Sequence, residues 1–213
     1  MRIEFKNVLP IPLADTPLSA ESCWKKESVI DSGQRYLVEA PSGTGKTTLI
    51  NIIYGTRRDY EGNVLMDGKN INSFSIDHWT MMRQEFLSAV FQDLRLFPQL
   101  SAIENIRIKN NLKTTLKEEE IRFMAEELGV AHRLNQKCGT LSLGQQQRIA
   151  IIRSLAQPFR LILLDEPFSH LDEENARKAC KMIEASCIKN EAGLLLTSLG
   201  PSSYFNFTGK IVI

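Results

Sequence analysis

A short glycine-containing loop between an apolar strand and a helix constrains this chain more than any other feature of its 213 residues. Residues 34–39 have strand character, and residues 46–55 are predicted to form a helix with an apolar stripe. Between them, Gly43 and Gly45 let backbone N–H groups converge without obstruction by a Cβ atom. The helix N-terminus adds unpaired N–H groups and a favourable dipole. The loop therefore predicts a phosphate-binding site in an α/β fold.

Consecutive residues of this loop and helix are the candidate phosphate ligands. Lys46 is placed to reach the β- and γ-phosphates of a nucleotide, and the Thr47 hydroxyl to bind Mg²⁺. The full set is Ser42, Gly43, Thr44, Gly45, Lys46, Thr47 and Thr48. The complete form of the motif begins with glycine, where this chain has Ala40. A plain glycine turn before an amphipathic helix with a solvated lysine is the alternative interpretation.

A second apolar run, residues 161–164, ends in the acidic pair Asp165 and Glu166. Because ligands bind at the carboxyl ends of buried parallel strands, Asp165 is predicted to hold Mg²⁺ directly or through water. Glu166 is placed to orient an attacking water or accept its proton. A strand that ends in a solvated acidic turn is the alternative.

Apolar runs that alternate with helical segments predict a mainly parallel sheet with helices on both faces. Further strands are expected at residues 63–66, 87–91, 194–197 and 210–213, and helices from Ser101, at 117–128, from near Leu143 and at 173–190. Residues 93–156 show no strand signal and are expected to form a helical insertion. We therefore predict one domain, residues 1–213, with a core of 1–92 and 157–213 and a helical subdomain of 93–156.

Composition excludes several classes of protein. The chain has 26 Lys and Arg against 25 Asp and Glu, a net charge of +1, which argues against a nucleic-acid or anionic membrane surface as the main partner. No apolar run is long enough to span a bilayer, and the N-terminus lacks the apolar core of a signal peptide. The four cysteines form no C-x-x-C pair, so reduced thiols are expected.

The segment 141–148, Leu-Ser-Leu-Gly-Gln-Gln-Gln-Arg, lies between the loop and the acidic pair. With it, the whole chain resembles the nucleotide-binding subunits of ATP-binding cassette (ABC) transporters. The stretch 97–106 is similar to the small bacterial cassettes of lipoprotein-release, cell-division and macrolide-export systems. The resemblance implies a P-loop NTPase fold with an N-terminal antiparallel β portion beside the parallel core.

Four further positions take roles from this resemblance. Gln92 matches the glutamine that contacts Mg²⁺ and the attacking water. Ser142 and Gly144 match the signature motif that closes over the γ-phosphate held by the opposite subunit. Asp172 matches the acid of the segment that communicates across the dimer. Asp165 and Glu166 match the metal-binding and catalytic acids.

The chain departs from the family pattern at four places. Ala40 replaces the leading glycine of the loop, and Leu143 replaces a signature glycine. Ser198 stands where the family carries a histidine that contacts the γ-phosphate, so hydrolysis is expected to be slower. No aromatic residue stands in the stretch 10–17 to stack on adenine, which leaves apolar contact from Ile11, Pro12 or Leu13; Trp24 is expected in the core.

These features predict an ATPase that uses ATP and Mg²⁺, with Glu166, Gln92 and Ser198 as catalytic residues and Thr47, Gln92 and Asp165 at the metal. Its expected partners are a second cassette subunit, packed head to tail around ATP, and integral membrane permease subunits that hold it at the cytoplasmic face of the membrane. A weakly hydrolysing regulatory cassette is the alternative, given Ser198. A soluble cassette of DNA repair or translation fits less well, because such chains usually carry coiled-coil arms or tandem cassettes, and the net charge near zero predicts no nucleic-acid partner.

Overall fold

A five-stranded parallel sheet forms the centre of the computed structural model, which describes residues 1–41, 43–113, 115–198 and 204–213. Its strands run in the order β6-β7-β8-β3-β9, and every neighbouring pair is parallel. The strands are β6 (Leu87–Val90), β7 (Leu161–Asp165), β8 (Gly193–Ser198), β3 (Arg35–Glu39) and β9 (Gly209–Val212). This confirms the predicted parallel core, with strand ends shifted by one or two residues.

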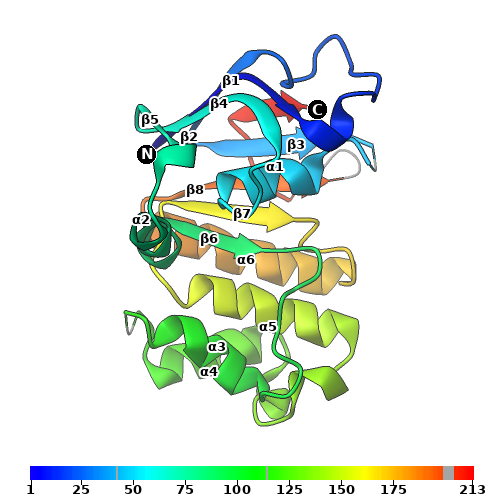
Figure 1. Ribbon diagram of the computed structural model, residues 1–213. Coiled ribbons are helices and arrows are strands. Elements are labelled where there is room, and N and C mark those ends of the chain that lie inside the picture. The colour runs from blue at the N-terminus through cyan, green and yellow to red at the C-terminus, as the bar shows by residue number, and fades with distance from the viewer. Residues whose placement is uncertain (42, 114, 199–203) are drawn as a thin grey trace.

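A four-stranded antiparallel sheet lies beside the core, in the order β2-β1-β4-β5 (Figure 1). Its strands are β1 (Arg2–Pro10), β2 (Glu27–Asp31), β4 (Tyr60–Met66) and β5 (Lys69–Asn70). The pairing of β1 with β4 shifts register between Lys6 and Leu9. Gly62 lies opposite this irregularity with φ 84°, and a Cβ there would meet the Asn7 carbonyl oxygen at 2.3 Å. The N-terminal β portion implied by the family resemblance is therefore present.

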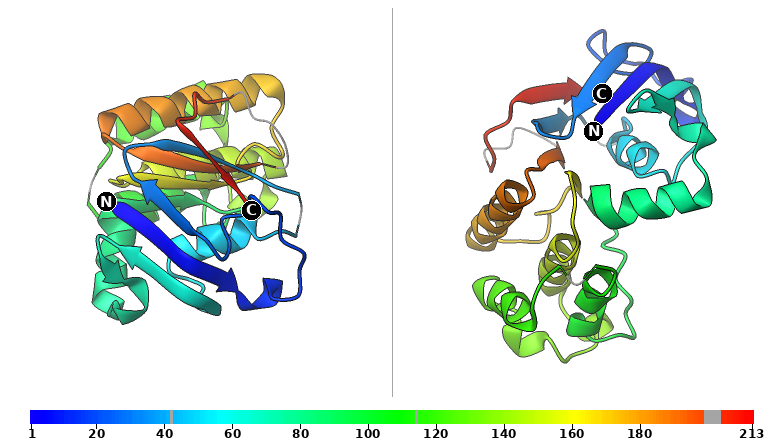
Figure 2. Two further views of the ribbon diagram at one scale, coloured as in Figure 1. Left: turned by 90° about the horizontal axis from the view of Figure 1, so that it is seen from above. Right: turned by 90° about the vertical axis from the view of Figure 1, so that its left-hand side faces the viewer.

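The centre of the parallel sheet is buried on both faces, because β7 and β8 are apolar over Leu161–Leu164 and Leu194–Leu196. Ile162 and Leu164 pack with α5 (Leu143–Leu155) and α6 (Glu173–Lys189), whereas Leu161 and Leu163 pack with α1 (Lys46–Ile53) and the antiparallel sheet. Figure 2 shows α1 between the two sheets and α6 on the opposite side of the parallel sheet. The strands therefore form a rigid platform whose carboxyl ends support the loops that follow them.

Three helices build the block that is inserted between β6 and β7, namely α3 (Ala102–Asn110), α4 (Glu118–Glu127) and α5. Capping boxes begin α3 at Ser101 with Glu104 and α5 at Ser142 with Gln145. The right-hand view of Figure 2 shows this block at one end of the molecule, away from the N-terminal strands. The helices expected from Ser101 and Leu143 are thus confirmed at their first residues.

One helix was not predicted from the sequence. Residues Ile76–Met81 form α2, which continues into a π turn over Met82–Phe86. Trp79 on α2 is buried at 3% exposure and packs on Gly55, where a Cβ would meet the indole at 2.4 Å. Short 3₁₀ turns complete the structure at Ile11–Leu13, Ile71–Ser73, Ala131–Arg133 and Cys138–Thr140.

All four cysteines are free and buried, which agrees with the expected reduced thiols. No helix within the described residues combines the length and apolarity that crossing a membrane requires.

Candidate functional site

Four strands of the parallel sheet deliver the predicted residues to one edge. The loop 40–45 follows β3, Gln92 follows β6, Asp165 ends β7, and Ser198 ends β8. The carboxyl ends of parallel strands meet at the same edge, so residues far apart in sequence converge there. The two signature residues, by contrast, lie on the helical block.

Two glycines shape the phosphate loop. Gly43 has φ 83° and Gly45 has φ 110°, a left-handed region that favours glycine. At Gly45, which caps α1, a Cβ would meet the Leu13 side chain at 2.8 Å and the Trp24 indole at 3.2 Å. The predicted ligand Ser42 lies outside the described residues. The loop therefore needs glycine both for its backbone and for the side chains packed over it.

Lys46 is folded back onto the loop rather than solvated. Its ammonium donates to the carbonyl oxygens of Ala40 at 2.8 Å and Pro41 at 3.0 Å. It also lies 3.6 Å from a carboxylate oxygen of Glu166, and its side chain is only 6% exposed. The solvated-lysine alternative is therefore wrong. The cation joins the phosphate loop to the acidic residue after β7.

Hydroxyl groups and an indole define the rest of the loop. Thr44 donates its hydroxyl to the Pro41 carbonyl at 2.8 Å, and its own carbonyl accepts the Trp24 indole N–H at 3.4 Å. Thr47 is exposed at the start of α1, while the Thr48 hydroxyl accepts from Arg57 at 3.2 Å. Trp24 is 2% exposed, so it belongs to the core as predicted, and it also braces the loop.

The three predicted metal ligands line one cavity of about 290 Å³. Its walls are Thr47, Phe91, Gln92, Asp93, Arg95 and Asp165. Asp165 is 1% exposed, and its Oδ1 accepts from the Thr197 hydroxyl at 2.7 Å. Its Oδ2 is buried and has no hydrogen-bond partner among the described residues. A buried carboxylate oxygen without a partner, beside a hydroxyl and an amide, fits Mg²⁺, which prefers oxygen ligands.

Glu166 has a left-handed backbone, with φ 47°. Its N–H donates to the Thr197 hydroxyl at 3.2 Å, and its carbonyl accepts from the Gln147 amide at 3.3 Å. Strained backbone held by its neighbours is common at functional sites. Thr197 thus holds both acids, Asp165 by its side chain and Glu166 by its backbone, although no motif in the sequence pointed to it.

Gln147 on α5 is a second residue that sequence reasoning missed. Its side chain is 1% exposed, and besides Glu166 it bonds Ser169 at 3.3 Å and accepts from the His170 N–H at 2.9 Å. Its position in the run 145–147 carried no signal that separated it from its neighbours. Gln147 therefore fixes the segment that links Glu166 to Asp172.

The signature residues are kept apart from the cavity. Ser142 is exposed at the N-terminus of α5, where its hydroxyl accepts from the Gln145 N–H at 3.3 Å. A Cβ on Gly144 would meet the His170 carbonyl oxygen at 2.7 Å, so the glycine lets α5 approach the segment after β7. Leu143 is 56% exposed and faces away from its own core. Ser142 and Leu143 therefore present an outward surface.

The remaining predictions concern Ser198 and the adenine contact. Ser198 is half-buried at the end of β8, level with Glu39 on β3, and its carbonyl accepts from the Ala40 N–H at 3.5 Å. It therefore lies beside the phosphate loop. Among the apolar residues expected near adenine, Leu13 is buried under Gly45, whereas Ile11 is 58% exposed.

Comparison with known proteins gives consistent results. A family model described as "ABC transporter" matches residues 27–169. The putative hemin import ATP-binding protein HrtA of Staphylococcus haemolyticus is 32% identical over 79% of this chain and 77% of its own length. The lipoprotein-releasing system ATP-binding protein LolD of Saccharophagus degradans is 32% identical over 69% of this chain and 66% of its own.

A solved structure extends the likeness to three dimensions. The dimeric post-hydrolysis state of the ATP-binding cassette MJ0796, bound to ADP and Pi, has a TM-score of 0.75 and 29% identity. The match covers 92% of this chain and 87% of that chain. With the family model, the sequence relatives and the converging site residues in agreement, this chain belongs to the ABC transporter family, as an ATP-binding cassette ATPase.

Proposed function

We propose that this chain hydrolyses ATP at the edge formed by β3, β6, β7 and β8 and drives membrane subunits of a transport or lipoprotein-release system. The observation that carries the proposal is the cavity shared by Thr47, Gln92 and Asp165, which come from three separate elements. The family match and the two ATP-binding relatives support it. Through such partners, the chain would sit at the cytoplasmic face of the membrane.

Each residue at this edge has a role in the proposed reaction. The N–H groups of the loop at Gly43 and Gly45 and the Lys46 ammonium bind the phosphates, as Lys46 exchanges the Ala40 and Pro41 carbonyls for phosphate oxygens. Glu166 orients the attacking water and takes its proton. Thr47, Gln92 and Asp165 would hold Mg²⁺, which neutralises phosphate charge when bound. Catalysis is then mainly positioning and electrostatic stabilisation.

We further propose that two such subunits close around ATP. Ser142 and the N–H groups at the start of α5 form an exposed anion site on the helical block, separate from the cavity of their own chain. A twofold axis places this site opposite the phosphate loop of the second subunit. The dimeric state of MJ0796 supports this arrangement.

The decisive experiment is steady-state and single-turnover ATPase measurement of the wild type and Glu166→Gln at concentrations where subunits dimerise. We expect the variant to lose at least 100-fold in turnover, since a general base contributes about 10²–10⁴-fold, while retaining ATP binding. Equal rates would reject the hydrolytic role of Glu166. They would instead favour a regulatory cassette of low turnover, the reading to which Ser198 already points.

A further inference from the structure

The chain turns sharply just after Gln92. Leu94 and Arg95 both have left-handed backbones, with φ 57° and 47°. A left-handed conformation is unfavourable for non-glycine residues, and such strain persists only where surrounding groups fix it. The loop that carries Gln92 is therefore held in a specific shape by its neighbours.

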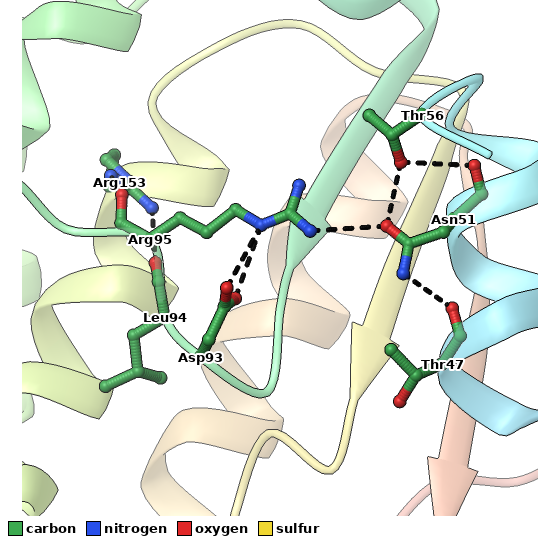
Figure 3. Close-up of polar contacts among 7 residues, drawn as sticks. All are labelled: Thr47, Asn51, Thr56, Asp93, Leu94, Arg95 and Arg153. Atoms are coloured by element: carbon green, nitrogen blue, oxygen red, sulfur yellow. Dashed lines mark hydrogen bonds and ion pairs between the residues drawn. The ribbon is translucent and has the colours of Figure 1, made fainter.

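One neighbour is Arg153 of α5. Its guanidinium donates to the carbonyl oxygens of Leu94 and Arg95, each at 2.6 Å (Figure 3). The Leu94 side chain is buried at 6% exposure, which anchors the same turn. Arg153 therefore fixes the backbone, and this backbone directs the Arg95 side chain toward the core subdomain rather than toward the helical block.

The Arg95 side chain makes three contacts there. Its guanidinium carbon lies 3.6 Å from the centre of the Phe91 ring, and its Nε donates to the Asp93 carboxylate at 3.3 Å. Its Nη2 donates to the Asn51 side-chain oxygen on α1 at 3.3 Å (Figure 3). The ring and the carboxylate thus orient a guanidinium that reaches another element.

Asn51 carries this contact to the metal cavity. Its side-chain N–H donates to the carbonyl of Thr47, one turn earlier in α1, at 2.8 Å, and its oxygen also accepts from Thr56 at 2.7 Å. Both groups of the amide are therefore engaged and its orientation is fixed. Arg95 consequently ties the loop of Gln92 to the first turn of the helix that presents Thr47.

The three predicted metal ligands among the six residues that line the cavity differ in how firmly they are held. Thr47 lies on α1 and Asp165 on β7, and both elements pack into the core. Gln92 is exposed on a loop, so its position depends on what fixes that loop. We propose that Arg95 is a positioning residue that, through Asn51, holds Gln92 toward the cavity shared with Thr47 and Asp165. This inference rests on the proposed role of Gln92 at Mg²⁺.

The contact is suited to positioning rather than to stability. The side chain of Arg95 is 40% exposed and that of Asp93 68% exposed, and exposed pairs contribute little to folding free energy. Arg95→Ala is therefore expected to fold like the wild type, which thermal unfolding checks. Without Arg95, amide hydrogens of residues 91–96 should exchange faster in the nucleotide-free chain.

The binding experiment uses chains that carry Glu166→Gln, a fluorescent ATP analogue and a Mg²⁺ titration. Arg95→Ala and Asn51→Ala are each expected to raise the Mg²⁺ concentration for half-maximal binding about fivefold, the effect of losing one typical hydrogen bond. The double variant should be no worse than the weaker-binding single variant. Arg160→Ala is the matched control, because Arg160 also bonds a carbonyl and an exposed acid but lies at the start of β7.

Gln92→Ala separates this inference from the proposed function. If Arg95 acts through Gln92, adding Arg95→Ala to Gln92→Ala produces no further shift. Two results would overturn the inference and leave the proposed function standing. In the first, Gln92→Ala shifts the Mg²⁺ titration while Arg95→Ala behaves like Arg160→Ala. In the second, the shifts caused by Arg95→Ala and Asn51→Ala add in the double variant. A silent Gln92→Ala rejects the proposed role of Gln92, and the inference falls with it.

Discussion

At the scale of single residues, the two oxygens of Asp165 have opposite surroundings. Thr197 donates to one, while the other is buried without a hydrogen-bond partner among the described residues. Leaving a buried acceptor unpaired costs about 1–3 kcal/mol, more when it is charged. This unpaired oxygen therefore lowers the stability of the isolated chain, and under the proposed function a cation bound at the cavity would restore it.

Asp165→Asn tests this carboxylate directly. The amide oxygen still accepts from Thr197, so the fold should survive, while Mg²⁺-dependent ATP hydrolysis should fall about 100-fold because an electrostatic contact in the transition state is lost. ATPase assays over a Mg²⁺ series measure the effect. Asp77→Asn, on the exposed first turn of α2, is the matched control. Retained hydrolysis in Asp165→Asn would remove this residue from the metal site.

Ser198→His tests the departure at the end of β8. Ser198 lies level with Glu39 beside the phosphate loop, and the family resemblance implies that a histidine at this position contacts the γ-phosphate. We expect single-turnover hydrolysis to accelerate at least about tenfold, since a positioned acid–base group contributes up to about 10²–10⁴-fold. Ser198→Ala shows whether the hydroxyl itself contributes. An unchanged rate in Ser198→His would mean that the serine does not limit turnover.

At the scale of elements, α5 connects both halves of the site. Near its start, Gln147 bonds the segment after Glu166, and near its end, Arg153 bonds the turn after Gln92. The same helix begins at Ser142, which faces outward. A shift of α5 would therefore move Glu166, the loop that carries Gln92 and the exposed helix start at Ser142 together.

Gly144→Ala tests the approach of α5 to the segment after β7. The new Cβ would lie 2.7 Å from the His170 carbonyl oxygen, so backbone must move, and we expect a loss of about 1–3 kcal/mol in the free energy of unfolding. Denaturant titration measures it. Gly33→Ala, where a Cβ meets nothing within 4 Å, should change stability little. A neutral Gly144→Ala would show that α5 adjusts without cost.

The hydrophobic periodicity of the sequence predicted the strands and helices of the core, but not the elements that form through contacts with distant residues. The apolar strands β7 and β8 and the capped helices α3 and α5 have strong local signals. The six-residue helix α2 lacks two turns of periodic pattern, and it forms because Trp79 packs on Gly55. The antiparallel sheet was predicted only because the family resemblance implies it.

The residues of the candidate site likewise fall into those that the sequence predicted and those that it did not. Residues in motifs, such as Lys46 and Asp165, were predicted because spacing from a strand end determines their place. Thr197 and Gln147 were missed, because their roles depend on contacts across 32 and 19 positions of sequence. The Lys46–Glu166 ion pair likewise arises only from the order of strands in the sheet.

At the scale of the whole molecule, three cations from separate elements meet near the junction of the core and the helical block. Burial, and then the charges of Arg153 and Arg83, lower the pKa of Lys109 on α3 from 10.5 to about 8. The unfolded chain then holds this proton up to pH 10.5 while the folded chain releases it near pH 8. The contribution of Lys109 to the free energy of unfolding therefore increases as pH rises from about 8 to 10.5.

The stability difference between the wild type and Lys109→Met isolates this contribution. Comparison of the two chains is needed because burial raises the pKa of Cys23 and Cys187 from 9.0 to about 12, which lowers stability above pH 9 in both. In denaturant titrations between pH 7 and 10, the free energy of unfolding of the wild type should rise relative to that of the variant. A constant difference would contradict the depressed pKa.

The brace over the phosphate loop gives the molecule an optical reporter of its own. Trp24 donates its indole N–H to the Thr44 carbonyl, while the second tryptophan, Trp79, lies far along the chain on α2. When nucleotide rearranges the loop, the emission of Trp24 should change in wavelength or intensity. In Trp79→Phe, this single fluorophore would report nucleotide entry without any attached dye, and an unresponsive spectrum would mean that the loop keeps its shape on binding.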